Sequence, residues 1–234
     1  MGDVYRNPLD SPELWDDVRK RHSRFEIPRN RNGWINEIES AANRDGLDSR
    51  LAERAEKVLG WIDEAGGRGV FSVGAGNAAL EYHLKKLRPS LPLVTSDFSP
   101  GSVELIRGHF EECDRVERFD IMGGDWSAVA AESRQVVLIN RLDPVLTNRQ
   151  WRSVFRDMGE SGVGMALMIL AWDLDLSGAI QAKLKQWRHR LEGRRLYPTG
   201  WARTGKTWRS LWASHYDAEE RRLGGLSAYL LRRR

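Results

Sequence analysis

The sequence predicts an α/β protein with a doubly wound, mostly parallel seven-stranded sheet, an antiparallel C-terminal strand pair and an N-terminal helical extension. Three observations support this fold class. A strand, a glycine turn and a helix follow one another directly within residues 67–87. Strand-like and helix-like segments then alternate as far as residue 190, and the last 30 residues contain two strand-like segments.

The part of the chain before the first strand is predicted to be helical. Ser11 followed by Pro12 is typical of a helix start, with serine at the N-cap and proline at the first helical position. A second short helix is expected from Trp34, and a third over residues 47–65, where apolar residues recur at helical spacing. We therefore divide the chain into a helical extension, residues 1–48, which we expect to act as a lid, and an α/β domain, residues 49–234.

Five strands and five helices are predicted to alternate in the central part of the chain. The strands are expected near residues 69–73, 92–96, 117–122, 135–140 and 163–171. The helices are expected near residues 77–88, 100–112, 126–133, 147–158 and 177–190. Runs such as Val136-Val137-Leu138-Ile139 are continuously apolar, which is typical of a parallel sheet covered on both faces.

The C-terminal segment changes character. Residues 207–216 and 223–231 are expected to be strands joined through residues 217–220, with no helix between them. Two strands joined by so short a connection pair in antiparallel fashion. His215 and Tyr216 would then stand at the end of a strand, from which they could reach a pocket, although such residues are more often structural.

The turn Gly74-Ala75-Gly76-Asn77 is the best candidate for a ligand site. Glycine lets the backbone turn tightly and lets a ligand approach closer than a side chain would permit. About 20 residues after such a turn, an acid at the end of the next strand can accept hydrogen bonds from ribose hydroxyls, and Asp97 stands at that position. The pattern predicts a nucleotide site, although an ordinary turn followed by an unrelated aspartate remains the alternative.

Composition excludes several other classes of protein. The chain has 234 residues, 41% of them hydrophobic, but no run near the roughly 20 apolar residues that a membrane span needs. No basic and apolar leader opens the sequence, so we expect a cytoplasmic protein. The single cysteine, Cys113, excludes an intramolecular disulfide, and no set of acidic or histidine residues has metal-ligand spacing, so we expect no metal site.

Positive charge is concentrated in the C-terminal part. Residues 181–234 contain 14 Lys plus Arg against four Asp plus Glu, in a chain whose net charge is +4. The candidates for an RNA-binding face are Arg188, Arg190, Arg194, Arg195, Arg203, Lys206 and Arg209. Such a face suits a phosphate-bearing partner, but an ordinary solvated helix surface has the same composition.

Four segments, taken in order, resemble the motifs of the class I S-adenosylmethionine-dependent methyltransferases: VFSVGAGNA, TSDFSPGSVELI, FDIMGGDWSAV and VVLINRLDPVL. The resemblance covers residues 50–234 and implies a Rossmann-like fold, methyltransferase activity and S-adenosylmethionine as the cofactor. The cofactor-binding residues that it implies are Ser72, Gly74, Ala75, Gly76, Asn77, Asp97, Phe98, Asp125, Trp126 and Asn140.

The resemblance also implies a role for each motif. The glycine turn would pass under the methionine part of the cofactor. Asp97 would hold both ribose hydroxyls, with Phe98 against the adenine. Asp125 would accept from the adenine amino group with Trp126 beside it, and Asn140 would end the fourth strand at the edge of the substrate pocket.

Two positions depart from the family pattern. Ser72 stands where the family usually has an acid near the methionine end of the cofactor, so this position supplies no charge for the amino or sulfonium group. Ala78 replaces the third glycine of the turn, which we expect to be tolerated because a helix has already begun there.

Two alternatives to a methyltransferase remain open. Gly74-x-Gly76-x-x-Ala79 also matches the dinucleotide fingerprint of nicotinamide-dependent oxidoreductases. Three features disfavour that class: the long helical segment before the first strand, the Gly-Asp-Trp after the third strand and the antiparallel ending. Ser72 suggests a further possibility, a methyltransferase fold that serves as a non-catalytic binding subunit.

The acceptor is predicted to be a small molecule rather than RNA. Six tryptophans fall in segments that form the acceptor pocket in members of the resembled family, and aromatic walls suit an apolar or planar molecule, although at least half of these tryptophans should be core residues. These are Trp15, Trp34, Trp172, Trp201, Trp208 and Trp212. Asp143 is the candidate catalytic residue, as a general base or as a group that orients the substrate, and capping of the helix after Pro144 is its alternative role.

Overall fold

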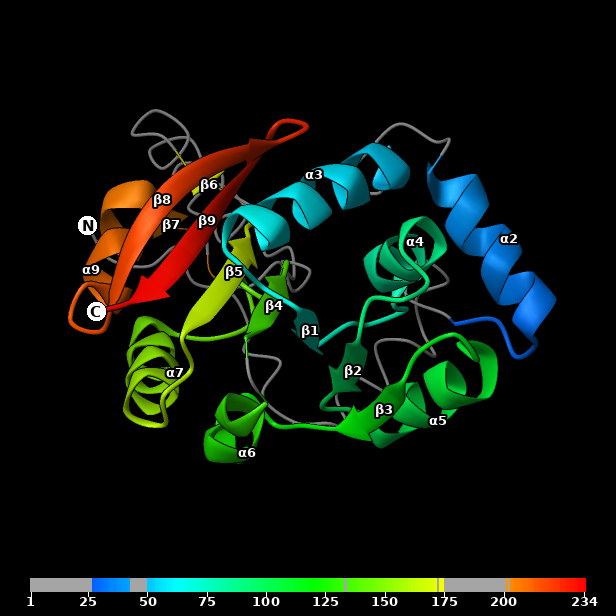
Figure 1. The fold of residues 1–234 in the computed structure, drawn as a ribbon, viewed down its shortest axis with the longest axis horizontal. Coiled ribbons are helices and arrows are strands. Elements are labelled where there is room, and N and C mark those ends of the chain that lie inside the picture. The colour runs from blue at the N-terminus through cyan, green and yellow to red at the C-terminus, as the bar shows by residue number, and fades with distance from the viewer. Residues whose placement is uncertain (1–26, 43–49, 133, 172, 175–200, 202) are drawn as a thin grey trace, which may run out of the picture.

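The computed structural model describes residues 27–42, 50–132, 134–171, 173–174, 201 and 203–234. Its centre is a seven-stranded sheet in the order β3-β2-β1-β4-β5-β9-β8 (Figure 1). The five strands of the parallel part are β1 (Gly69–Val73), β2 (Leu93–Asp97), β3 (Arg115–Arg118), β4 (Gln135–Asn140) and β5 (Met165–Ile169). The predicted α/β class with a mostly parallel, doubly wound sheet is confirmed.

The antiparallel ending is confirmed, and the second predicted strand, 223–231, largely coincides with β9, whereas the predicted position of the first strand was wrong. The pair is formed by β8 (Tyr216–Leu223) and β9 (Leu226–Arg233), and β9 also pairs antiparallel with β5. The hairpin turns at Gly224 and Gly225, which have φ of 55° and 89°. Glycine adopts these left-handed conformations without a side-chain clash, so the chain reverses here rather than at residues 217–220.

Residues 207–216, predicted as a strand, belong mainly to helix α9 (Gly205–Trp212). The side chain of Thr204 accepts from the backbone N–H of Thr207, which caps the helix start. Trp208, Leu211 and Trp212 are buried, at the spacing of one helix face. The high β-propensity of this Thr- and Trp-containing segment was therefore overridden by a cap and a helical apolar stripe.

Helices cover both faces of the sheet (Figure 1). One layer contains α2 (Arg31–Ala42), α3 (Leu51–Glu64), α4 (Ala79–Leu87) and α5 (Pro100–His109). The other layer contains α6 (Trp126–Ala131), α7 (Asn148–Glu160) and α9. None of the helices among the described residues is long and apolar enough to cross a membrane.

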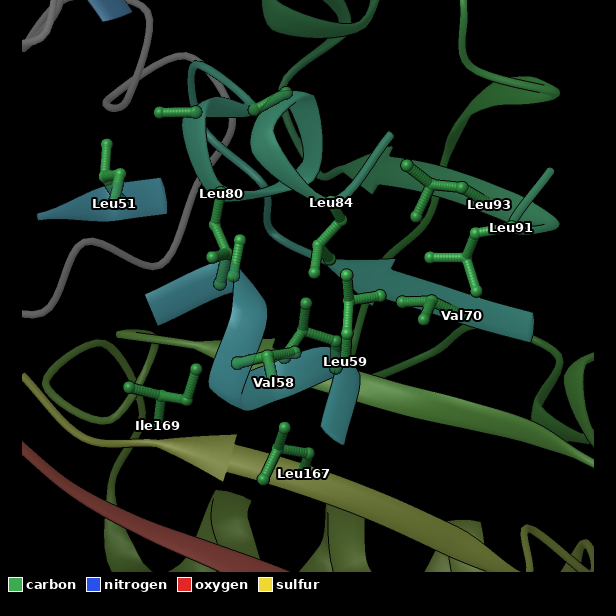
Figure 2. Close-up of a cluster of buried hydrophobic side chains, with 14 of the residues drawn as sticks. Leu51, Val58, Leu59, Val70, Leu80, Leu84, Leu91, Leu93, Leu167 and Ile169 are labelled. Carbon is green, nitrogen blue, oxygen red and sulfur yellow. The ribbon is translucent and has the colours of Figure 1, made fainter. Parts of the chain in front are cut away.

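The central strands β1, β2, β4 and β5 bury both of their faces, which explains apolar runs such as that of β4. In β4, Val136 and Leu138 contact the layer of α3 and α4, whereas Val137 and Ile139 contact the layer of α6 and α7. Figure 2 shows the first of these two cores, where side chains from both helices meet the strands. Those labelled are Leu51, Val58, Leu59, Val70, Leu80, Leu84, Leu91, Leu93, Leu167 and Ile169.

Other predicted elements differ in extent or lie outside the described residues. The third strand covers 115–118 rather than 117–122, because the backbone of Asp120 accepts from the N–H groups of Gly123 and Gly124 and turns the chain. A short parallel pair, β6 (Asp173–Leu174) with β7 (Arg203–Thr204), was not predicted. The helices expected at Ser11 and over 177–190 lie outside the described residues.

Helix α2 of the predicted extension packs into the same core as the α/β domain. Ile27, Trp34 and Ile38 are buried in the cluster formed by α3, α4 and β1. Arg31 forms an ion pair with Glu112, and its Nε donates to the backbone oxygen of His109 at 3.1 Å. The proposed boundary at residue 48 falls outside the described residues.

Candidate functional site

The glycine turn has the backbone conformation that its sequence predicts. Gly74 and Gly76 both have φ of 66°, in the left-handed region that side chains disfavour. A Cβ on Gly74 would lie 2.6 Å from both Cδ atoms of Leu142, so this glycine also allows the loop after β4 to approach. A Cβ on Gly76 would meet no atom within 4 Å, so the space beside Gly76 is open.

The sheet register brings the candidate residues to one edge. Val73, the last residue of β1, is paired with Ser96 of β2 and with Ile139 of β4. The glycine turn, Asp97 and Asn140 follow directly on these three residues, so they meet at the carboxyl edge of the parallel strands. This is the edge at which ligands bind in open α/β sheets.

Asp97 contacts the glycine turn. Its side chain is buried, its Oδ2 accepts from the backbone N–H of Gly76 at 3.0 Å, and its Oδ1 accepts from the N–H of Ser99 at 2.9 Å. A carboxylate can accept about four hydrogen bonds, and these two fix its orientation beside the turn. Phe98, the next residue, is half-buried.

Ala78 holds a conformation that the sequence analysis did not expect. Its φ is 57°, and α4 begins only at Ala79, so the explanation that a helix had already begun at this position was wrong. A left-handed conformation costs a non-glycine residue about 1–2 kcal/mol. Trp34 supports the turn nearby, because its fully buried indole donates to the backbone oxygen of Asn77 at 2.8 Å.

Ser72 has an acidic partner that the sequence analysis missed. Its buried hydroxyl donates to Oε1 of Glu81, on α4, at 2.5 Å. Burial raises the pKa of Glu81, opposed mainly by the hydrogen bond from Ser72. An acid in the first turn of a helix is common, so nothing in the sequence distinguished Glu81 from a solvated residue.

Asp125 and Trp126 have local structural roles. Asp125 is exposed and caps α6, where its Oδ1 accepts from the N–H groups of Ser127 and Ala128 and from the Ser127 hydroxyl at 2.5 Å. The hydrogen bond from that hydroxyl and then the one from Ala128 lower the pKa of Asp125. Trp126 is buried, with its ring 4.8 Å from that of Phe119. The predicted ligand contacts of both residues stay predictions.

Protein-family models do not match this chain, and no curated protein sequence matches it. Solved structures do. Human N-acetylserotonin methyltransferase, in complex with S-adenosylmethionine, has a TM-score of 0.60 and 17% identity over 97% of this chain and 60% of its own. Magnesium protoporphyrin IX methyltransferase from Synechocystis PCC 6803, with bound S-adenosylmethionine, has a TM-score of 0.55 and 10% identity over 98% of this chain and 100% of its own. A protein described as a putative Zn-dependent alcohol dehydrogenase from Rhodobacter sphaeroides has a TM-score of 0.54 and 17% identity, over 72% of this chain and 85% of its own.

The chain has the class I methyltransferase fold. At these identities the likeness concerns the fold alone, and the chain spans 60% of the length of the human enzyme.

Asp143 lies in the loop that follows β4 of the methyltransferase fold. It is buried, and its Oδ1 accepts from the N–H of Ala171 at 2.7 Å, which ties the loop to the end of β5. The predicted alternative role, capping of the following helix, was wrong: Thr147 and Gln150 form the capping box of α7. The catalytic role of Asp143 stays a prediction.

Arg203, from the predicted basic face, stabilises this loop. It is buried, its Nη1 donates to the backbone oxygen of Asp143 at 2.7 Å, and its Nη2 donates to that of Leu146. Its guanidinium also lies 4.9 Å from the ring centroid of Trp208. Arg209 pairs with Glu220 at 2.9 Å, whereas residues 188–195 of the predicted face lie outside the described residues.

Most of the tryptophans that the structure describes serve the core. Trp34, Trp208 and Trp212 are fully buried packing residues. Trp201 is half-buried and its backbone N–H donates to Pro144 O at 2.7 Å, which places it beside the loop after β4. Trp15 and Trp172 lie outside the described residues.

His215 and Tyr216 lie far from the candidate site along the strands. The Tyr216 hydroxyl donates to the backbone oxygen of Val163 at 3.0 Å, just before β5 begins. Both residues lie near the amino ends of the parallel strands, opposite the ligand edge, and the buried Tyr216 has the structural role that the sequence analysis gave as the commoner one. Within the described ranges, no group of three or more His, Cys, Asp or Glu could hold a metal ion.

Proposed function

We propose that this protein is an S-adenosylmethionine-dependent methyltransferase that acts on a small molecule. The observation that carries the proposal is the contact between Asp97 and the glycine turn. A buried carboxylate, fixed by the N–H groups of Gly76 and Ser99 at the carboxyl edge of a parallel sheet, is suited to accept the hydroxyls of a ribose.

The residues of the site fit the adenosine part of the cofactor. The open space beside Gly76 leaves room for a ligand close to the backbone. The half-buried ring of Phe98 follows Asp97 directly and supplies an apolar surface for a purine. Solved neighbours of the same fold contain S-adenosylmethionine, which supports this choice of cofactor over a nicotinamide.

When bound, S-adenosylmethionine supplies a methyl group that its sulfonium already activates. The protein then has to align an acceptor with that group and, where the acceptor requires it, remove a proton. The buried carboxylate of Asp143, bonded to Ala171, suits a role in positioning the loop between β4 and α7. A role as general base requires that loop to move.

A small-molecule acceptor is favoured over RNA. The described arginines of the basic C-terminal part largely bind acids or backbone oxygens of the same chain, as Arg203, Arg209 and Arg221 do. Salt bridges within the chain reduce the positive field that a phosphate backbone needs. The two methyltransferases compared above are named for small molecules, N-acetylserotonin and magnesium protoporphyrin IX.

Calorimetric titration with S-adenosylhomocysteine tests the proposal. We expect saturable binding that weakens by about 100-fold in Asp97→Ala. Each ribose hydroxyl then loses a hydrogen bond to a charged acceptor, worth about 1.5–3 kcal/mol, and hydrogen bonds to water replace part of that energy. Asp217→Ala, on the exposed edge strand β8, is the control and should bind like the parent. Absence of binding at millimolar ligand, or binding of NADH instead, would exclude the proposed function.

A further inference from the structure

Glu81 carries a buried carboxylate that the fold does not satisfy. The residue is fully buried, with 0% of its surface exposed. One oxygen, Oε1, accepts from the hydroxyl of Ser72, but no hydrogen-bond partner is found for the other, Oε2. A buried carboxylate oxygen without a hydrogen-bond partner is costly, so Glu81 requires either a bound proton or a donor that arrives from outside.

The carboxylate lies beside residues of the candidate site. Ser72, its partner, is two residues before Gly74 on β1, the strand that leads into the glycine turn. The ionisable groups with which Glu81 interacts are Arg141 and Asp97. These residues follow β4 and end β2, the two strands that flank β1, so the carboxylate lies between them at the ligand edge.

The bond that Ser72 donates to Glu81 leaves the serine oxygen able to accept a further hydrogen bond. A serine hydroxyl has one proton to donate and two lone pairs to accept. In this structure the proton is donated to Glu81, so the lone pairs of Ser72 can accept from a second donor. A cationic N–H group beside Ser72 would therefore bond to a hydroxyl that is backed by a negative charge, which strengthens the interaction.

We propose that Glu81, held by Ser72, is the anionic group with which this site recognises a ligand that carries a primary ammonium group. The inference rests on the proposed function, in which that group is the α-ammonium of the methionine part of the cofactor. The negative charge that Ser72 does not supply from the strand is provided by helix α4, through Glu81. Glu81 is thus a positioning and selectivity residue, not one that reacts.

Two nucleosides separate this role from a purely structural one. S-adenosylhomocysteine carries the ammonium group, whereas 5′-methylthioadenosine has the same adenosine and sulfur but no amino-acid part. Glu81→Gln preserves the size of the side chain and removes its charge. We expect Glu81→Gln to weaken S-adenosylhomocysteine binding by about tenfold to 100-fold, the loss typical of a charged hydrogen bond, and to leave 5′-methylthioadenosine binding unchanged.

Matched variants make the experiment decisive. Glu53→Gln removes an exposed glutamate from α3 and should leave the affinity for both nucleosides unchanged. Ser72→Asp combined with Glu81→Gln moves the carboxylate from the helix to the strand and should restore the preference for S-adenosylhomocysteine. Thermal unfolding of each variant establishes that it is folded before titration.

The possible outcomes distinguish the inference from the proposed function. Equal S-adenosylhomocysteine affinity in the parent and in Glu81→Gln overturns the role of Glu81 while the methyltransferase proposal stands. An equal loss of affinity for both nucleosides also overturns it, because a structural defect does not discriminate between the ligands. Failure of the parent to bind either nucleoside overturns the proposed function and this inference together.

Discussion

Glu81 should make a contribution to the stability of the ligand-free protein that is lost as the pH rises above the ordinary pKa of a glutamate. Its carboxyl is fully buried, and burial raises its pKa above the ordinary value of 4.5. Between the unfolded and the folded pKa the native state binds more protons than the unfolded state. The contribution of Glu81 is therefore fully present below the unfolded pKa and is lost as the pH rises through the folded pKa.

The magnitude follows from proton linkage. A single group changes the free energy of unfolding by at most about 1.4 kcal/mol per pH unit. Glu81→Gln removes the titrating group. As the pH rises, the free energy of unfolding of the parent should therefore fall relative to that of the variant, by up to about 1.4 kcal/mol per pH unit. Ser72→Ala removes the hydrogen bond that lowers the pKa of Glu81, so it should extend the same pH dependence to higher pH.

Urea unfolding at pH 5, 6, 7 and 8, followed by tryptophan fluorescence, measures these differences. Other titrating groups cancel in the comparison of parent with variant, and the slope of unfolding with urea reports whether the unfolded state has changed. Parallel pH profiles for the parent, Glu81→Gln and Ser72→Ala would refute the reasoning, because they would mean that the carboxyl is solvated in the native protein.

Three further predictions test the parts of the fold that hold the site. Trp34→Ala should lower the free energy of unfolding by about 3–5 kcal/mol, a loss typical of a buried tryptophan, whereas Trp34→Phe should lose chiefly the hydrogen bond to Asn77, about 1 kcal/mol. Equal melting temperatures for the parent and Trp34→Ala would mean that α2 does not pack as described. Arg203→Met leaves two backbone oxygens without their charged donor, so urea unfolding should show a free energy of unfolding about 3 kcal/mol lower than that of the parent. The control Arg209→Met should lower it by less than about 1 kcal/mol. A loss in Arg203→Met no larger than that of the control contradicts the role of Arg203 in the loop. Asp97→Asn has only one oxygen to accept from the N–H groups of both Gly76 and Ser99, so the side chain should lose its orientation. Calorimetry should then show the affinity for S-adenosylhomocysteine lowered by about tenfold or more. An unchanged affinity would place the ribose elsewhere.

The parts of the fold that depend on local pattern were predictable from the sequence. The apolar strands and the helices between them predicted the parallel sheet, since burial of both strand faces favours apolar residues at successive positions. Gly74 and Gly76 marked the turn because their backbone conformation disfavours side chains, and Asp97 was identified by its distance along the chain. The segment 207–216 was misassigned, because propensity favoured a strand where a capping threonine and tertiary packing form α9.

Contacts between elements that are distant in sequence were decided only by the tertiary structure. Nothing local distinguishes Glu81 from a solvated helix acid, and its burial against Ser72 follows only from the packing of α4 on β1. Nothing local distinguishes Arg203 from the other arginines of a basic segment, yet it lies buried on the loop that carries Asp143. Pattern and spacing report what a residue needs from its own strand or helix, whereas the partner of a buried charge is set by the three-dimensional fold.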